Sequence, residues 1–294
     1  MNNSIKGSLS ILSGAFLISF SPVFVNLVSI EPTVSGFYRM LFGSIALFII
    51  YLIKNNENPL RKNISKFIVL GAIFFSLDLW FWHRSIIYVG PGLSTLLANF
   101  QILILPFLAL IFFNQKTQRI QIFSIFLGLL GLFLITGQSW DIAGNNYKLG
   151  VLFGLLTAIS YAGYIISMKR IDHDAAVNSD PIFNLLFISL ISAGLLFLFS
   201  IIEQVPLEIK SSSELIWMIC YGLFSHVLGW FFILNGLQKI SAVTAGIILL
   251  TQPILSYVWD FIIFKKVILP IEYFGIVSVL LAMIITIKSE NQKS

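Results

Sequence analysis

Apolar segments of about 20 residues recur along the whole chain, with short polar stretches between them. A helix needs about 20 apolar residues to cross the roughly 30 Å hydrocarbon core of a bilayer. The segments that reach this length lie at about 9–28, 33–53, 66–88, 92–113, 120–138, 149–168, 181–202, 213–237, 242–264 and 270–288. The pattern therefore predicts an all-α integral membrane protein with ten transmembrane helices.

The composition supports this prediction. Hydrophobic residues make up 57% of the 294 residues, charged residues 11%, and the mean hydropathy is +0.94, far from the values of a soluble domain. One charged side chain, Lys6, precedes the first segment, which we expect to be a retained helix rather than a cleaved signal peptide. The single cysteine, Cys220, excludes a disulfide within one chain.

The distribution of Lys and Arg predicts that both termini are cytoplasmic. With that orientation twelve basic residues lie in inner segments, and four lie in outer segments: Lys148, Lys210, Lys265 and Lys266. The inner excess also accounts for the net charge of +5, so we expect no nucleic-acid partner.

The two halves of the chain resemble each other. Residues 88–101 align with 239–252, and Gln101 falls on Gln252, with a proline close behind each glutamine. We predict two repeats of five helices, residues 1–143 and 144–294. Because five is an odd number, the repeats have opposite orientations in the membrane, which is typical of alternating-access transporters.

Several short motifs, in order along nearly the whole chain, resemble the drug/metabolite transporter superfamily, specifically its bacterial ten-helix branch with two EamA-type repeats. They are Phe37-Tyr38-Arg39-Met40-Leu41, the short links Gly90-Pro91-Gly92 and Ser241-Ala242, and the glycines Gly128, Gly131 and Gly275. One departure is that Asn114-Gln115 and Lys265-Lys266 replace an acidic step common in the family. The resemblance implies that spans one, three, four, six, eight and nine line a central cavity and that the substrate is a small metabolite.

Polar and aromatic side chains within the predicted spans are the candidates for substrate binding, because buried polar groups in a bilayer usually face a cavity or a partner. The candidates are Asp78, Trp82, Asn99, Gln101, Tyr161, His226, Trp230 and Gln252.

Asp78 and His226 are the favoured titratable pair. Aligning Phe75-Ser76 with Phe224-Ser225 puts His226 one residue from the counterpart of Asp78, so the two side chains could meet across the pseudo-two-fold axis. Such a pair could couple transport to protons or bind a cationic group, or it could simply hold helices together.

The other candidates act by hydrogen bonding or stacking. Gln252-Pro253 lies at mid-depth, where a proline breaks the helix and frees a carbonyl group. The alternative for Gln101 and Gln252 is a hydrogen bond that stiffens the bundle. The aromatic residues could stack on a flat or cationic solute or pack in the core.

Three further charged or titratable residues within the spans have more modest expectations. We expect a structural role for Arg39, near the outer end of its span with Glu31 upstream, and we place His83 and Arg84 close to the outer interface.

The sequence contains no phosphate-binding loop and no hydrolase motif. Asp172-His173-Asp174 has metal-capable side chains but no further ligands nearby, so we expect a solvated loop. No cofactor and no metal are expected.

These features predict a secondary transporter or facilitator, and not an enzyme, in the cytoplasmic membrane of a bacterium. It would move an amino acid, a nucleoside-like molecule or a cationic compound by alternating access. A lipid or glycolipid flippase is an alternative, as is a membrane-embedded enzyme using Asp78 and His226. The expected partners are the solute, the bilayer and, if transport is coupled, protons, with the chain as a monomer or homodimer. The direction of transport and the choice between coupling and passive flow stay open.

Overall fold

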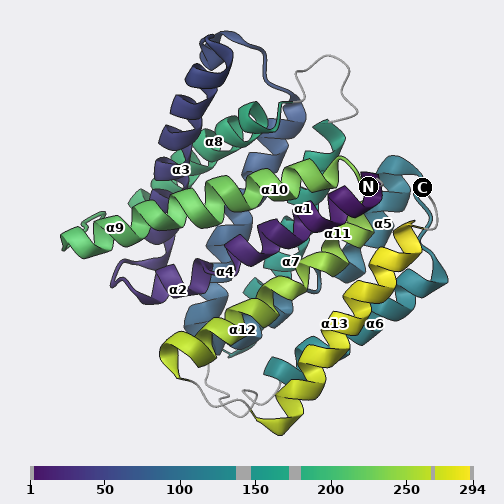
Figure 1. The fold of residues 1–294 in the computed structure, drawn as a ribbon. Coiled ribbons are helices and arrows are strands. Elements are labelled where there is room, and N and C mark those ends of the chain that lie inside the picture. Colours follow the sequence, from purple (N-terminus) through teal and green to yellow (C-terminus); the bar gives the residue numbers. More distant parts are fainter. Residues whose placement is uncertain (1–2, 137–146, 172–179, 266–268, 292–294) are drawn as a thin grey trace.

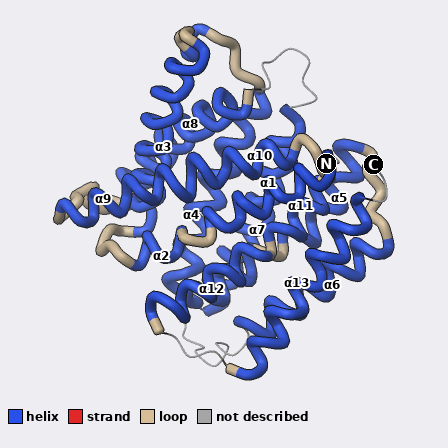
Figure 2. The backbone as a smooth tube through the Cα atoms, viewed as in Figure 1, coloured by secondary structure: helices blue, strands red, loops and turns tan. Residues whose placement is uncertain are grey.

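The computed structural model describes residues 3–136, 147–171, 180–265 and 269–291, and every regular element within these residues is a helix (Figures 1 and 2). In chain order the elements are α1 (Asn3–Ile18), α2 (Ser21–Asn26), α3 (Pro32–Asn55), η1 (Pro59–Arg61), α4 (Lys66–Ala98), α5 (Gln101–Phe113), α6 (Arg119–Thr136), α7 (Tyr147–Ile171), α8 (Pro181–Ile202), α9 (Ser212–Cys220), η3 (Tyr221–Leu228), α10 (Gly229–Leu237), α11 (Ala242–Leu249), α12 (Thr251–Phe264) and α13 (Pro270–Asn291).

The number of apolar helices agrees with the sequence. Within the described residues, seven helical segments are long and apolar enough to cross a bilayer, and three shorter apolar helices accompany them. α1 and α2 together form the first span, and α9, η3 and α10 form one continuous span from Ser212 to Leu237. These elements confirm an all-helical chain with ten apolar helical segments.

Apolar side chains cover the outside of the bundle, and small polar side chains lie inside it. Ile53 is 80% exposed and Phe107 and Phe274 are each 70% exposed, whereas Ser189 and Thr244 have no exposed surface. Water would penalise this distribution and a lipid environment favours it. The chain is therefore built as a multi-span membrane protein.

The helix packing has an internal two-fold pattern. α1 packs along α10, α4 along α7, α3 along α8, and α6 along α13 (Figure 1). Exchanging the two halves of the chain converts the first pair into the second and maps each of the other two pairs onto itself. These four packing relationships are thus preserved when the two halves are exchanged.

Glycines allow α1 and α10 to approach closely. A Cβ atom added at Gly14 would lie 2.6 Å from the carbonyl oxygen of Gly229, and one added at Gly236 would lie 2.7 Å from the carbonyl oxygen of Gly7. Backbones at such short range exclude any side chain at the crossing, which is the usual function of glycine between membrane helices.

Four residues with left-handed backbone form symmetric pairs. Asn56 (φ 51°) ends α3 and Gln204 (φ 55°) follows α8, the second spans of the two halves. Asn114 (φ 52°) ends α5 and Lys265 (φ 54°) follows α12, at the fourth spans. Asn114 and Lys265 begin the two steps where the sequence departs from the family's acidic pattern, and in the structure both residues stop a helix.

The predicted tight link between the third and fourth spans lies within α4. The Ser94 hydroxyl donates a hydrogen bond to the Trp82 carbonyl at 3.2 Å. In a straight helix residues 12 positions apart are about 18 Å apart, so the chain reverses direction between Trp82 and Ser94.

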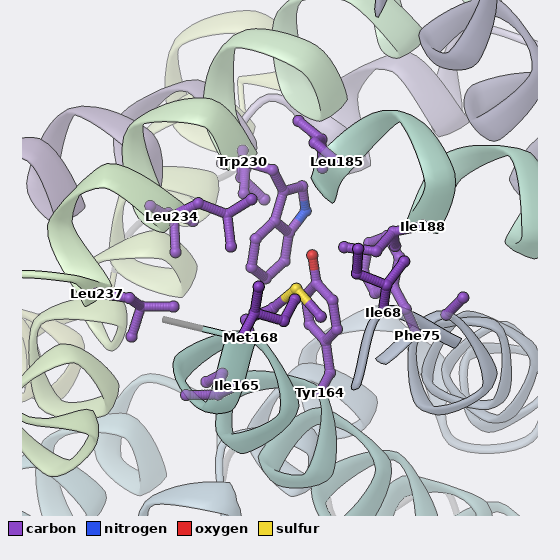
Figure 3. Packing of buried hydrophobic residues seen from close by; sticks show 14 of the residues in the cluster. Ile68, Phe75, Tyr164, Ile165, Met168, Leu185, Ile188, Trp230, Leu234 and Leu237 are labelled. Carbon is purple, nitrogen blue, oxygen red and sulfur yellow. The ribbon is translucent and has the colours of Figure 1, made fainter. Parts of the chain in front are cut away.

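An aromatic cluster packs where α4, α7 and α10 meet (Figure 3). The rings of Phe75 and Tyr164 stack with centroids 4.5 Å apart, and Trp230 meets Tyr164 edge-on at 4.6 Å. Trp230 is 2% exposed, and both Trp230 and Phe75 border a cavity that lies between the helices. The cluster therefore forms one wall of that cavity.

Candidate functional site

A cavity of about 80 Å³ lies at the centre of the bundle, several times the space that one water molecule requires. Six of the eight predicted site residues line it: Asp78, Trp82, Asn99, Tyr161, Trp230 and Gln252. They come from α4, α7, α10 and α12 and from the residue that follows α4.

Three helix interruptions lie beside the cavity. α1 gives way to α2 at Ser19-Phe20, α4 to α5 at Asn99-Phe100, and α11 to α12 at Leu250. A broken helix at membrane depth leaves backbone groups available to a ligand, because they lack their usual partners. The predicted interruption near Gln252 is therefore present, and two more accompany it.

Prolines follow two of these interruptions. Pro22 and Pro253 lack the N–H that would bond the carbonyl four residues earlier, at Ile18 and Leu249. Ile18, Pro22 and Gln252 line the cavity. The carbonyl of Ser19, at the first interruption, accepts a hydrogen bond from the Ser256 hydroxyl at 2.9 Å, which ties α12 to the end of α1.

Among the described residues that line the cavity, one side chain is acidic and one is basic: Asp78 on α4 and Arg39 on α3. Arg39 is 4% exposed, and Nη1 donates a hydrogen bond of 3.1 Å to the Tyr221 hydroxyl. No ion pair within 4.0 Å joins Asp78 to any basic group in the described part of the chain. A carboxylate and a guanidinium group thus face the same space without neutralising each other directly.

Arg39, for which the sequence predicts a structural role, also lines the cavity. The expected neighbour Glu31 is exposed and has no ion pair with Arg39 among the described residues, and the guanidinium instead lies 4.8 Å from the centroid of the Tyr221 ring. Arg39, like Asp78, is a charged residue within an apolar span, and such residues are candidates for a cavity lining. Small hydroxyl residues such as Thr95, Thr157 and Ser256 also line the cavity and gave no such signal.

His226 and Gln101 lie outside the cavity lining. His226 is in the π-helix η3, where Nε2 is 2.6 Å from the Ser189 hydroxyl oxygen and the ring stacks on Phe75 with centroids 5.8 Å apart. Gln101 has no exposed surface and lies beside the side chain of Tyr161, which lines the cavity.

The predicted pairing of Asp78 with His226 has no contact in this structure to support it. No hydrogen bond or ion pair joins them within the described chain. Gly43 on α3 packs against the imidazole so closely that an added Cβ would lie 2.5 Å from Cδ2. His226 thus packs between Gly43 on α3 and Ser189 on α8.

No group of three metal-binding side chains occurs among the residues that the structure describes. The sequence Asp172-His173-Asp174 lies outside these residues.

A bundle of membrane-spanning helices around a charged central cavity defines a class, the multi-span membrane transport proteins. The sequence matches the EamA-like transporter family over residues 5–137 and 148–288, and the chain belongs to this family. It is 23% identical over 299 residues to an uncharacterized transporter of Clostridium kluyveri, covering 98% of this chain and 94% of that protein. It is 22% identical to the uncharacterized transporter YyaM of Bacillus subtilis, covering 86% of this chain and 83% of that protein.

A solved structure described as "Crystal structure of protein" has the same fold, with a TM-score of 0.82 at 13% identity and coverage of 97% of this chain and 98% of that one. The family and these relatives make the chain a membrane transporter.

Proposed function

We propose that this transporter is a secondary transporter that moves a small metabolite carrying both a positive and a negative group, such as an amino acid, by alternating access. The observation that supports this most is the placement of Asp78 and Arg39, which line one cavity without an ion pair between them. The proposed location is the cytoplasmic membrane of a bacterium, with both termini inside.

Charged side chains within a membrane protein are costly, and insertion scales give about 2.5–3.5 kcal/mol for each charged side chain at the centre of a span. A zwitterion provides a counter-charge for both: its ammonium group for Asp78 and its carboxylate for Arg39. A bound solute of this kind stabilises the site more than a solute with one charge does, because a single charge leaves one protein group unpaired.

The walls suit a solute with an apolar or flat body. Trp82 and Tyr161 line the cavity beside the Trp230 indole, and Trp230 lies 6.1 Å from Tyr161, edge-on. Aromatic faces also attract cations, which supports placing the ammonium group at this end of the cavity. Gln252 and Asn99 provide neutral hydrogen-bonding groups at the helix interruptions.

The internal symmetry supports alternating access as the mechanism. α1 packs along α10 as α7 packs along α4, so exchanging the packing of the two halves would give a second, equivalent arrangement around the same site. Residues from both halves, such as Asp78 and Gln252, line that site, so moving one half against the other would expose it to each side in turn.

The test uses purified protein and calorimetric titration with three probes: an aromatic α-amino acid, its amide without the carboxylate, and its N-acetyl derivative without the ammonium. We expect the amino acid to bind at least about tenfold more tightly than either derivative, because a hydrogen bond to a charged group contributes about 1.5–3 kcal/mol.

Two variants assign the two ends of the solute. Asp78→Asn should abolish the affinity difference between the amino acid and its N-acetyl derivative and keep the difference between the amino acid and its amide. Arg39→Gln should do the reverse. Glu57→Gln, which removes a surface ion pair with Lys62, should change neither. Equal affinities for all three probes, or variants that do not shift these preferences, would contradict the proposal.

A further inference from the structure

A second cavity, of about 180 Å³, lies at the end of the bundle where α3 begins and α8 ends. Its polar lining consists of Glu31, Thr33, His83, Arg84, Tyr88 and Glu203. It shares no lining residue with the central cavity, but Trp82 of the central cavity is the neighbour of His83 in α4, with ring centroids 5.2 Å apart. With the proposed orientation this end faces the outside of the cell.

The carboxylate of Glu203 is held in this cavity by three neighbouring side chains. Oε1 accepts a hydrogen bond from Trp80 Nε1 at 2.5 Å and forms an ion pair with Arg84, and Oε2 accepts one from the Thr33 hydroxyl at 2.9 Å. The Arg84 guanidinium also lies 3.5 Å from the centroid of the Trp80 ring. Arg84 is therefore fixed and neutralised, and Glu203 retains room for another donor because a carboxylate can accept about four hydrogen bonds.

The imidazole of His83, by contrast, makes no hydrogen bond among the described residues. It is 1% exposed, and neither ring nitrogen has a hydrogen-bond partner within the described chain. Gly36 lets the imidazole pack directly on α3, because a Cβ there would lie 3.3 Å from Cε1. A buried polar atom without a partner costs about 1–3 kcal/mol, and a ligand or a water molecule that completes the bonding is one way to remove that cost.

The charges select the kind of ligand. The lining carries two carboxylates, Glu31 and Glu203, and one guanidinium, Arg84, which is already paired with Glu203. The described lining therefore carries a net negative charge, beside the buried His83 ring, whose two nitrogens have no partner among the described residues. This combination accepts hydrogen bonds from a cation and does not favour an anion.

We propose that this second cavity is a binding site for the ammonium group of a solute, held by His83, Glu203 and Glu31, before the solute reaches the central cavity. The inference rests on the proposed function for the identity of the solute. The site itself follows from the second cavity alone.

The test is cysteine modification of intact protein in vesicles. Cys220 is the only cysteine, so Ile87→Cys in a Cys220→Ala background places one thiol at the second cavity, where Ile87 is 62% exposed. A trimethylammonium-bearing methanethiosulfonate should react about tenfold faster than its sulfonate analogue, relative to their rates with a free thiol, because a negative cavity concentrates cations. Propylammonium should slow the reaction, and propionate should not.

Variants separate this site from the central one. Protection by propylammonium should persist in Asp78→Asn and disappear in His83→Phe, which keeps a ring and removes both nitrogens. If His83→Phe does not fold, Glu31→Gln should reduce the preference for the cationic reagent, with Glu57→Gln as the matched control. Protection lost in Asp78→Asn but kept in His83→Phe, or equal relative rates for the two reagents, would overturn the inference and leave the central site untouched.

Discussion

The hydroxyl of Tyr221 accepts a hydrogen bond from Nη1 of Arg39 at 3.1 Å, and the Tyr221 ring lies 4.8 Å from the guanidinium carbon. Tyr221 begins the π-helix η3 and is completely buried. It is the protein group that fixes the direction of the single positive charge among the described residues of the central cavity.

Tyr221→Phe tests this positioning role. The ring stays under the guanidinium while the hydroxyl is lost, and a hydrogen bond to a charged group contributes about 1.5–3 kcal/mol. We expect affinity for the zwitterionic probe to fall about tenfold while affinity for the amide probe, which lacks the carboxylate, stays unchanged. Calorimetric titration measures both. An equal loss for both probes would indicate a general packing defect instead.

Substitution of Asp78 should affect transport, whereas substitution of His226 should affect stability. Asp78→Asn should leave the melting temperature unchanged and reduce transport, because Asp78 lines the central cavity without an ion pair among the described residues. If transport is coupled to protons, the variant should also flatten the pH dependence of uptake, since Asp78 is the only carboxylate among the described lining residues. Uptake into proteoliposomes and thermal unfolding check these outcomes.

His226→Ala should instead destabilise the protein by about 2–4 kcal/mol, because it empties a packed space and leaves Ser189 without its partner. Transport per folded molecule should change little. If His226→Ala folds normally but does not transport, His226 takes part in transport and the structural role proposed for it is contradicted.

The close crossing of α1 and α10 predicts a contrast between two glycines. Gly14→Ala would bring Cβ within 2.6 Å of the Gly229 carbonyl oxygen, whereas Gly194→Ala on α8 meets nothing within 4 Å. We expect the first to destabilise the protein by about 1–3 kcal/mol through overpacking. The second should stabilise it by up to about 1 kcal/mol through helix propensity. Unfolding in mixed detergent micelles measures the difference.

The interruption between α11 and α12 should matter for transport more than for folding. Pro253→Ala supplies an N–H that can extend the helix and withdraw Gln252 from the cavity that it lines. We expect transport to fall about tenfold, corresponding to one lost hydrogen bond of about 1–1.5 kcal/mol, with no loss of stability. Pro270→Ala is the control, because a proline at the first position of α13 removes no helical hydrogen bond.

The orientation is tested by reporter fusions. Ten spans place both ends of the chain on one side of the membrane, and the start of α1 and the end of α13 lie on the same side of the bundle in Figure 1. A C-terminal alkaline phosphatase fusion should be inactive and a fluorescent protein fusion bright, as a cytoplasmic C-terminus requires. The opposite pattern would reverse the assignment of the second cavity to the outside.

The helices and six of the residues that line the central cavity could be predicted from the sequence. Segment length and isolated polar residues are local signals, which need no knowledge of the fold. Asp78 and Gln252 were recognisable as costly groups in apolar spans, and both line the cavity. The direction of a side chain around its helix is less accessible. The π-helix at Tyr221–Leu228 widens the turn and rotates its side chains away from their α-helical directions, so no α-helical periodicity could place His226.

The charge of Arg39 within an apolar span is visible in the sequence, but its place beside Asp78 is not, because only the fold brings α3 and α4 to the same cavity. Likewise the bond between Ser189 and His226 joins residues 37 positions apart on different helices. Such contacts depend on packing rather than on any local pattern.

The paired left-handed residues show what the two halves share beyond the identity of their residues. Asn56 and Gln204 differ, as do Asn114 and Lys265, yet each member of a pair reverses its backbone at the matching end of a span. None of the four is glycine, so each carries a small steric penalty for that conformation. Two halves that share few residues can therefore still end their helices at matching positions, because the backbone torsion angles there do not depend on which side chain is present.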